Sequence, residues 1–186
     1  MLDVNFSPFP ILVTERLVLR EATMEDAPEV FFLRSDADVI KYVDRAPAQS
    51  LEEANSFIQM VIDNRIKNTG ISWNITLKGA DKMIGNIALW RLDAANYRAE
   101  IGYVLHPEHQ GKGIMFEAMK AVIHYAFHEM QLHSIEANIN PGNMSSQRVL
   151  ERAGFIREAY FKENYYYNGR FLDSAIYSLL SPLPHQ

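Results

Sequence analysis

The sequence predicts a single α/β domain of the α+β kind, with a mixed, mostly antiparallel central sheet of about seven strands flanked by helices. Three observations support this fold class. Segments with the two-residue period of strands and segments with the helical period occur along the whole chain. The length of 186 residues suffices for one full core. No internal repeat or low-complexity linker divides the chain, so residues 1–186 are assigned to one domain with residues 1–11 as an irregular lead-in.

The sequence of the first part of the chain predicts one strand and two helices. The strand is expected over residues 14–20, and the helices over residues 24–34 and 51–68, with a polar loop or short helix between them. Ser50 and Glu53 have the spacing of a capping box, which marks the start of the second helix. Gly70 is expected to end that helix, because glycine adopts the left-handed conformation common after a helix.

The rest of the chain predicts an antiparallel meander of three strands, followed by alternating helices and strands. These elements are expected at residues 71–77, 83–91 and 98–105, then 114–130 (helix), 133–139, 145–153 (helix), 154–162 and 171–180. Asn168-Gly169 is the dipeptide typical of a two-residue hairpin turn, so the last two strands are expected to pair.

The composition excludes several classes of function. The net charge is −5 and no block of basic residues occurs, which argues against binding nucleic acid through its phosphates. The chain has no cysteine, so disulfides, thiolate nucleophiles and Cys-ligated zinc are excluded. Asp3 and two prolines near the N-terminus do not fit a secretory signal, and no apolar run is long enough for a membrane span. We therefore expect a cytoplasmic protein.

A metal site is not expected either. His124 and His128 are four residues apart on a predicted helix, a spacing that zinc ligands can have. Glu129 follows the second histidine instead of the first, so the His-Glu-x-x-His order is absent.

The most informative stretch is the glycine-rich turn from Gln110 to Met115, which joins a predicted strand to a predicted helix. Two glycines let the backbone approach a ligand, and the first amides of the helix favour an anion. Lys112 adds a positive charge. The dinucleotide fingerprint fails because Phe116 stands where its third glycine belongs, and a Walker A loop needs Ser or Thr where Gly113 follows the lysine. A plain strand-to-helix turn is the alternative.

Gln110-Gly111-Lys112-Gly113-Ile114 resembles the pyrophosphate loop of the GNAT N-acetyltransferase superfamily; Met115 departs from the Gly or Ala that usually follows. A second element strengthens the resemblance: Asn143-Met144-Ser145-Ser146, followed by Glu151-Arg152-Ala153-Gly154-Phe155, is similar to the Asn-x-x-Ser helix of these enzymes. The resemblance extends over nearly the whole chain, and it is closest to the ribosomal-protein N-terminal acetyltransferases (RimJ/RimL type).

The resemblance implies a single GNAT-type domain with a V-shaped splay between the fourth and fifth strands, and acetyl-CoA as cosubstrate. The backbone of the strand end would pair with the pantetheine arm, as a peptide pairs with a sheet edge. Asn143 would be a further contact, or would only satisfy the loop before its helix. The implied cofactor-binding residues are Tyr103, Val104, Leu105, Gln110, Gly111, Lys112, Gly113, Ile114, Met115, Asn143 and Ser146.

Two catalytic residues are implied. Glu100 stands on the strand before the loop, where the family often has a catalytic base; it could instead be an exposed carboxylate paired with Arg98 or Arg91. Ser146 is the implied acid for the leaving thiolate, because Leu150 replaces the tyrosine that many members use. Ser146 could also be an N-cap, although Ser145 could take that role.

The implied reaction is direct attack of a primary amine on acetyl-CoA through a tetrahedral intermediate. The acceptor expected from the resemblance is a protein or peptide N-terminal α-amine. Alternatives are a small amine (antibiotic, amino acid or polyamine) and a non-catalytic acyl-CoA-binding module. A monomer and a homodimer are both compatible with the sequence.

Overall fold

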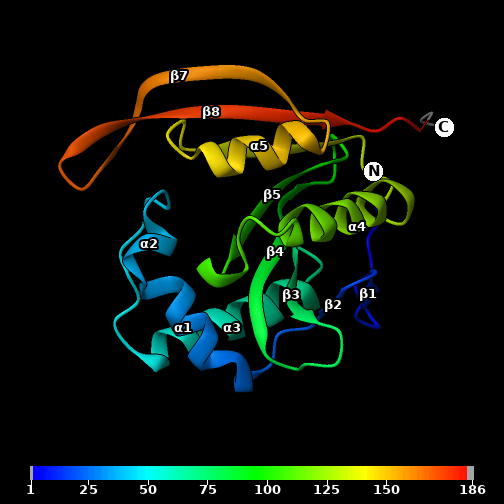
Figure 1. Ribbon diagram of the computed structural model, residues 1–186. Coiled ribbons are helices and arrows are strands. Elements are labelled where there is room, and N and C mark those ends of the chain that lie inside the picture. The colour runs from blue at the N-terminus through cyan, green and yellow to red at the C-terminus, as the bar shows by residue number, and fades with distance from the viewer. Residues whose placement is uncertain (1, 184–186) are drawn as a thin grey trace.

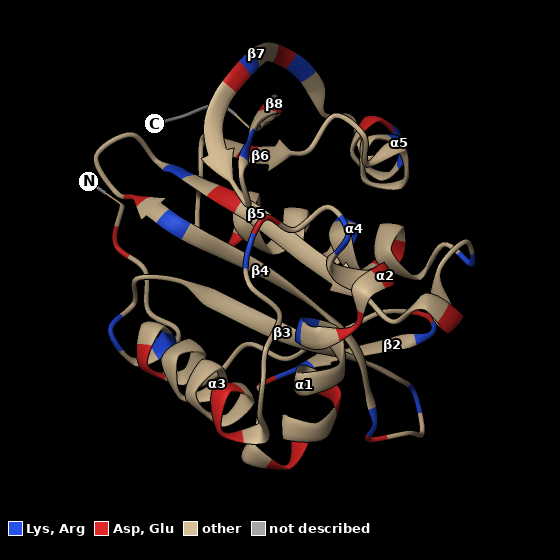
Figure 2. Ribbon diagram, turned by 90° about the vertical axis from the view of Figure 1, so that its left-hand side faces the viewer, with Lys and Arg blue, Asp and Glu red and all other residues tan. Residues whose placement is uncertain are grey.

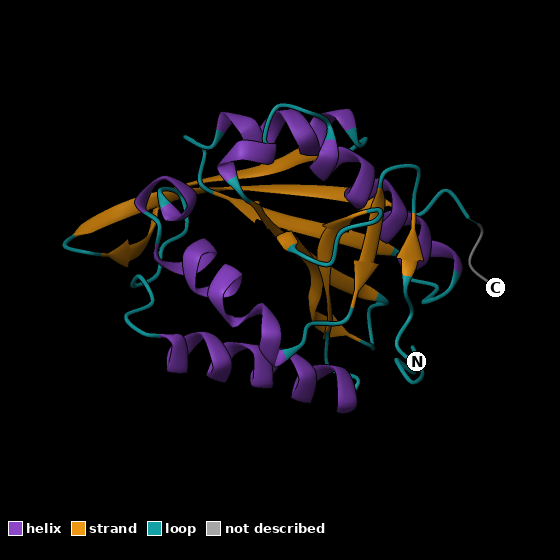
Figure 3. Cartoon of the chain, turned by 60° about the horizontal axis from the view of Figure 1, so that its bottom comes forward, coloured by secondary structure: helices purple, strands orange, loops and turns teal. Residues whose placement is uncertain are grey.

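The computed structural model describes residues 2–183, which form one eight-stranded sheet with helices on both sides (Figures 1 and 3). The strand order is β1-β2-β3-β4-β5-β6-β8-β7. Within the described chain, β5 and β6 are the one parallel pair of neighbours. The strands are β1 (Leu12–Val13), β2 (Leu17–Arg20), β3 (Ile71–Leu77), β4 (Met83–Asp93), β5 (Arg98–Leu105), β6 (Ser134–Ile139), β7 (Ile156–Tyr167) and β8 (Arg170–Leu180).

The fold class predicted from the sequence is confirmed, with one more strand than expected. The additional strand is β1, which has only two residues and pairs with Val18 and Leu19 of β2. A segment of that length is too short to produce a periodic signal. The predicted first strand is also shorter than expected, since β2 begins at Leu17 and not at residue 14.

Two pairs of helices cover the sheet. The helices α1 (Ala27–Ser35) and α3 (Leu51–Ile66) pack together on one side, and α4 (Ile114–His128) and α5 (Met144–Arg152) lie on the other (Figure 1). The main core forms between α4 and the sheet, and the apolar face predicted for α4 is buried there. A second, smaller core lies between α1, α3 and β4. Shorter helical segments are η1 (Met24–Asp26), α2 (Ala37–Ile40) and η2 (Pro107–His109).

The ends of α3 differ in detail from the prediction. Ser50 Oγ accepts a hydrogen bond from the Glu53 amide, as in a capping box, but the Glu53 carboxylate accepts from the Gln49 amide and not from Ser50. The helix ends at Ile66, and Asn68 takes the left-handed conformation, with φ of 54°. Gly70 is therefore not its terminating residue. Asparagine tolerates this conformation because its short polar side chain bonds locally.

The last two strands form a long hairpin that projects past the rest of the sheet (Figure 1). Its turn is Asn168-Gly169, as predicted, with positive φ at both residues. The strand before the turn continues to Tyr167 and not to residue 162, because a register shift between Phe161 and Tyr165 interrupts its alternation.

Residues 2–11, the described part of the lead-in, form no regular element, yet they belong to the core. Phe6 is fully buried, and its amide donates to Asn68 Oδ1 at 3.0 Å. Trp73 Nε1 donates to the carbonyl of Pro10 at 2.7 Å. These contacts fix the lead-in against β3 and the turn that precedes it.

The feature that positions the site is the separation of β5 from β6. The two strands pair only from Arg98 to Glu100 on β5, opposite Ser134 to Glu136 on β6. Beyond Glu100 they diverge, which confirms the predicted splay between the fourth and fifth of the expected strands. No helix within residues 2–183 is long and apolar enough to cross a membrane.

Candidate active site

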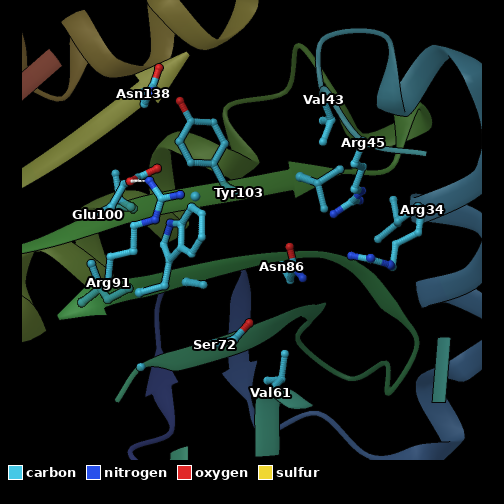
Figure 4. Close-up of a pocket in the computed structure, with 18 of the residues that line it drawn as sticks. Arg34, Val43, Arg45, Val61, Ser72, Asn86, Arg91, Glu100, Tyr103 and Asn138 are labelled. Carbon is cyan, nitrogen blue, oxygen red and sulfur yellow. Dashed lines mark hydrogen bonds and ion pairs between the residues drawn. The ribbon is translucent and has the colours of Figure 1, made fainter. Parts of the chain in front are cut away.

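A cavity of about 690 Å³ lies at the splay (Figure 4). Strands β4, β5 and β6, helices α1 and α3 and the segment after α2 contribute to its wall. Among the predicted site residues, those that line the cavity are Glu100, Tyr103, Val104, Asn143 and Ser146. Within the described chain, residues 110–115 do not belong to this wall. The glycine-rich turn and the cavity are therefore two separate parts of the site.

Glu100 is placed where β5 leaves β6. Its side chain is buried, and Oε2 accepts a hydrogen bond from Arg91 Nη1 at 2.8 Å. Burial raises the pKa of this carboxyl group above its ordinary value, against the opposing effect of the Arg91 charge. The predicted partner Arg98 is paired with Glu136 instead. Glu100 thus forms an ion pair with Arg91, as the non-catalytic alternative expected, but its side chain is buried and not exposed.

Arg91 reaches Glu100 from an irregular part of β4. The register between β4 and β5 shifts between Trp90 and Asp93, and Arg91 has φ of 48°, in the left-handed region. A bulge redirects a side chain that would otherwise alternate across the sheet. Here the bulge lets both Arg91 and Trp90 line the cavity beside Glu100. The two side chains form a cation–π contact, with Arg91 Cζ 4.3 Å from the centroid of the Trp90 ring.

The structure separates the roles considered for Ser146 and Asn143. Asn143 Oδ1 accepts from the Ser146 amide at 3.0 Å, so Asn143 is the N-cap of α5. Neither Ser145 nor Ser146 caps the helix. The Ser146 hydroxyl is buried and lies 2.6 Å from the Tyr103 hydroxyl. Burial raises the pKa of Tyr103 to about 12, so this phenol stays protonated at neutral pH.

The glycine-rich turn has the geometry expected of an anion site. Gly111 and Gly113 have φ of 71° and 75°, and Gly113 is the N-cap of α4 without a side-chain acceptor for the first amides. A Cβ at Gly111 would meet no atom within 4 Å, so the backbone there faces open space. Gln110 Nε2 donates to the Leu105 carbonyl at 3.1 Å, which ties the turn to the end of β5. Lys112 is exposed, and its carbonyl accepts from Arg16 at 3.0 Å.

Met115 does not obstruct the turn. Its side chain is 7% exposed and belongs to the main core, and Ile114 beside it is also buried. The side chain that departs from the usual Gly or Ala thus packs beneath α4.

The residues present fit a coenzyme A molecule. The edge of β5 that turns away from β6 after Glu100 offers unpaired backbone groups, as an extended pantetheine arm requires. The uncapped amides at the start of α4, with the open space at Gly111, suit a pyrophosphate. The strand edge and the helix start are linked by Gln110.

The sequence makes Tyr42, Trp90 and Tyr165 candidates for an acceptor pocket, and all three line the cavity, but it gives no signal for the charged side chains on the wall opposite Glu100. This wall comes from the end of α1 and the segment after α2, and it includes Arg34, Tyr42, Asp44 and Arg45. Tyr165 of β7 also lines the cavity, and its hydroxyl donates to the Asp44 carboxylate. Residues 35–50 were expected to be a polar loop or short helix, and no periodic pattern indicates which of their side chains point inward. Of the two tryptophans, Trp90 lines the cavity, and Trp73 lies in the core.

Comparisons with known proteins agree with this geometry. A family model described as an acetyltransferase (GNAT) domain matches residues 16–156. YoaA, an uncharacterized N-acetyltransferase of Bacillus subtilis (strain 168), is 35% identical over 174 residues, which are 94% of this chain and 98% of YoaA. The solved structure of the microcin C7 self-immunity acetyltransferase MccE with acetyl-CoA and AMP is 26% identical, with a TM-score of 0.83, and the match covers 96% of this chain and 99% of that chain.

Relatives with named acceptors differ from one another. The ribosomal-protein-serine acetyltransferase of Escherichia coli (strain K12) is 35% identical over 98 residues, 53% of this chain and 55% of that protein. The spermidine N(1)-acetyltransferase of Vibrio cholerae serotype O1 is 24% identical over 162 residues, 87% of this chain and 91% of that protein. The family model spans most of the chain and YoaA nearly all of it, so the chain belongs to the GNAT family of acetyltransferases.

Proposed function

We propose that the protein transfers the acetyl group of acetyl-CoA to the α-amine of a protein or peptide N-terminus. The observation that carries this proposal is the placement of Glu100. It is a buried carboxylate in a cavity, located where β5 leaves β6 and the strand edge becomes free for a thioester arm. A base at this position faces both the acceptor space and the end of the predicted cosubstrate path.

The cosubstrate is held by two parts of the chain. The amides at the start of α4, with Gly111, Lys112 and Gly113, would bind the pyrophosphate. The backbone of Tyr103, Val104 and Leu105 would pair with the pantetheine arm, and an amide near its end would face the thioester oxygen. When bound, acetyl-CoA supplies the activated acetyl group.

Glu100 acts as the general base in this proposal. An α-amine has a pKa of about 8, so it is mostly protonated at neutral pH and must lose a proton before it attacks. Within residues 2–183, Oε2 of Glu100 accepts a hydrogen bond from Arg91 and Oε1 forms no hydrogen bond. That free oxygen is available to accept the proton, directly or through water. Burial raises the pKa of Glu100 and so makes its carboxylate a better base.

Ser146 and Tyr103 assist the leaving thiolate. Their hydroxyls form one hydrogen-bonded pair that lines the cavity. The coenzyme A thiol that leaves has a pKa of about 8.5 by analogy with other thiols. This pKa is well below the value of about 12 that burial gives the Tyr103 hydroxyl, so the thiolate is a weaker base than the tyrosinate. The pair therefore stabilises the thiolate by donating a hydrogen bond and does not have to complete the proton transfer. Asn143 positions Ser146 by capping α5.

The proposal is tested by an acceptor screen with labelled acetyl-CoA on the wild type, Glu100→Gln and Ser146→Ala. The panel includes peptides with free N-termini, the same peptides with acetylated N-termini as blanks, and small amines that include spermidine. Turnover of the free peptides that is lost in Glu100→Gln supports the proposal. Turnover of small amines but of no peptide would show that the acceptor is a small molecule and not a protein N-terminus. Tight binding of acetyl-CoA without turnover of any amine would show a binding module instead of an enzyme.

A further inference from the structure

Two arginines occupy the end of the cavity that lies opposite Glu100 (Figure 4). Arg34 is in the last turn of α1, and Arg45 follows α2. The Ala48 amide donates to the Arg34 carbonyl at 2.9 Å, which ties the segment that carries Arg45 to the helix that carries Arg34. The close-up shows both guanidinium groups directed toward Asn86, with Tyr103 and Glu100 beyond it.

Neither guanidinium has an anionic partner within residues 2–183. The Nε atoms of both side chains are buried and make no hydrogen bond, and no ion pair is formed by either residue in the described chain. The Arg34 guanidinium lies 4.0 Å from the centroid of the Phe57 ring, a contact that orients the group without satisfying its N–H donors. Buried polar groups in proteins are nearly always paired, so an exception of this kind needs an explanation.

The two charges also affect each other. Burial, together with the nearby charge of Arg34, lowers the pKa of Arg45 to about 10. Burial lowers the pKa of Arg34 as well, although the Glu53 carboxylate partly offsets this effect. Both groups remain cationic at neutral pH. Two like charges that are held together and partly removed from water form an unfavourable arrangement unless a ligand compensates it.

Other charged groups at the cavity do not supply that compensation. Asp44 lines the cavity, but its carboxylate accepts a hydrogen bond from Tyr165. Arg91 and Glu100 are paired with each other at the far end. The wall thus contains three cationic and two acidic side chains (Arg34, Arg45 and Arg91 against Asp44 and Glu100), in a chain whose net charge is −5. The excess of positive charge lies at Arg34 and Arg45.

The phosphates of the cosubstrate are not a suitable source of this anion. The turn that fits a pyrophosphate, residues 110–115, lies outside the cavity wall that Arg34 and Arg45 line. The anion must then belong to the other substrate. Guanidinium groups are well matched to carboxylates and phosphates, because they donate in a planar fork.

We infer that Arg34 and Arg45 bind an oxyanion, a carboxylate or a phosphate, that the acceptor carries in addition to its amine. This inference rests on the proposed function and narrows its acceptor class. Glu100 receives the amine at one end of the cavity, and the arginines hold the anionic group at the other. A polycationic acceptor such as a polyamine is excluded by the same charges.

Matched acceptors test the inference. Serine-initiated tripeptide amides carry aspartate, asparagine, phosphoserine or serine at the second or third position, so that each anionic peptide has a neutral counterpart. The wild type is expected to show kcat/KM higher by about tenfold or more for an anionic peptide than for its counterpart. The aspartate and phosphoserine arms identify which oxyanion is used. Equal rates within each pair, or a preference for spermidine, would overturn the inference.

Variants connect the preference to the two arginines. Arg34→Gln and Arg45→Gln are expected to reduce the preference toward unity with no change in KM for acetyl-CoA, whereas Arg45→Lys retains part of it. Arg157→Gln, which removes one of the exposed charges along β7 (Figure 2), is the matched control and should keep the full preference. Persistence of the preference in both glutamine variants would refute the assignment. If a glutamine variant does not fold, the lysine variants of both residues replace it.

A binding measurement separates this inference from the proposed function. The same peptides are titrated by calorimetry into the protein saturated with coenzyme A. Anionic peptides are expected to bind the wild type more tightly than neutral ones, and Arg45→Gln should not discriminate between them. Arginine-dependent binding without acetylation of any peptide would refute the proposed function and leave the anion site standing. Acetylation of anionic and neutral peptides at equal rates would refute the anion site and leave the proposed function standing.

Discussion

The hydroxyl groups of Tyr103 and Ser146 lie 2.6 Å apart and join β5 to α5 at the wall of the cavity. In the proposed mechanism this contact supplies a tyrosine hydroxyl although Leu150, fully buried in the core, holds the position where many GNAT enzymes have a tyrosine. A tyrosine from a different element brings its hydroxyl to the same serine. The proposed mechanism therefore gives the acid role to the pair of hydroxyl groups and not to Ser146 alone.

The Tyr103–Ser146 contact is expected to be energetically coupled. In Ser146→Ala the Tyr103 hydroxyl loses its 2.6 Å contact with Ser146 Oγ and keeps only the 3.4 Å contact with the carbonyl of residue 146, which should lower the free energy of unfolding by about 1–3 kcal/mol. The Tyr103→Phe and Ser146→Ala substitutions together should cost less than the sum of their separate costs, with a coupling of about 0.5–3 kcal/mol. Denaturant unfolding of the four proteins measures this coupling. Additive costs would show that the two hydroxyls do not bond.

Loss of Glu100 is expected to affect catalysis and not folding. Glu100→Gln should lower kcat/KM by about 10²–10⁴-fold, the usual contribution of a general base. In the wild type, kcat/KM should fall as the pH drops through the raised pKa of Glu100, because the protonated form cannot accept a proton. This acidic limb should be absent from the pH–rate profile of the variant. Glu21→Gln, which breaks the ion pair with Arg65 outside the cavity, is the control and should keep the wild-type profile.

Deprotonation of Glu100, which should raise the activity, should lower the stability of the fold. Its pKa is higher in the folded protein than in the unfolded chain, so folding favours the protonated form. The contribution of Glu100 to stability is fully present below its unfolded pKa and is lost as the pH rises through the folded pKa. Thermal unfolding of Glu100→Gln at neutral pH should therefore occur at or above the wild-type midpoint. A large decrease would indicate that the Arg91 ion pair is structural.

Asn143 is expected to act through the helix that it caps. Asn143→Ala should destabilise the protein by about 1 kcal/mol, the usual cost of removing an N-cap. Asn143→Asp preserves the acceptor for the Ser146 amide and should restore most of this loss. Unfolding measurements and the dissociation constant of acetyl-CoA distinguish the two roles. Weaker cosubstrate binding in both variants, at unchanged stability, would identify Asn143 as a direct contact.

Met115 is expected to contribute to stability and not to cosubstrate affinity. Its side chain is buried in the main core, so Met115→Ala should cost about 2–5 kcal/mol of unfolding free energy. Met115→Leu keeps the volume and should cost less than about 1.5 kcal/mol. Calorimetric titration with acetyl-CoA should give similar affinities for both variants and the wild type. Tighter binding in the alanine variant would mean that the methionine does obstruct the turn.

The parts of the site that the sequence predicted are those encoded in consecutive residues. The turn at Gln110–Met115 and the helix after Asn143 have local patterns, and the structure places both where their patterns indicate. The partnership of Tyr103 with Ser146 spans 43 positions. Arg34 ends a predicted helix and Arg45 lies in a region without period, and neither pattern indicates that the two side chains share a cavity. Such contacts depend on how helices dock on the sheet, which local propensity does not specify.

The divergence of β5 from β6 has a consequence for how the protein is handled. Beyond Glu100, β5 pairs with β4 on one side only, and backbone hydrogen bonds next to such an unpaired edge open more readily than those inside a fully paired sheet. A cosubstrate that pairs with that edge acts as a missing piece of the sheet, and at 100 times its dissociation constant it adds about 2.7 kcal/mol to the folded state. The protein is therefore expected to be most resistant to heat and proteolysis when purified and stored with coenzyme A. Hydrogen exchange of the backbone amides at residues 101–105 is expected to slow as the fraction of protein with bound coenzyme A rises.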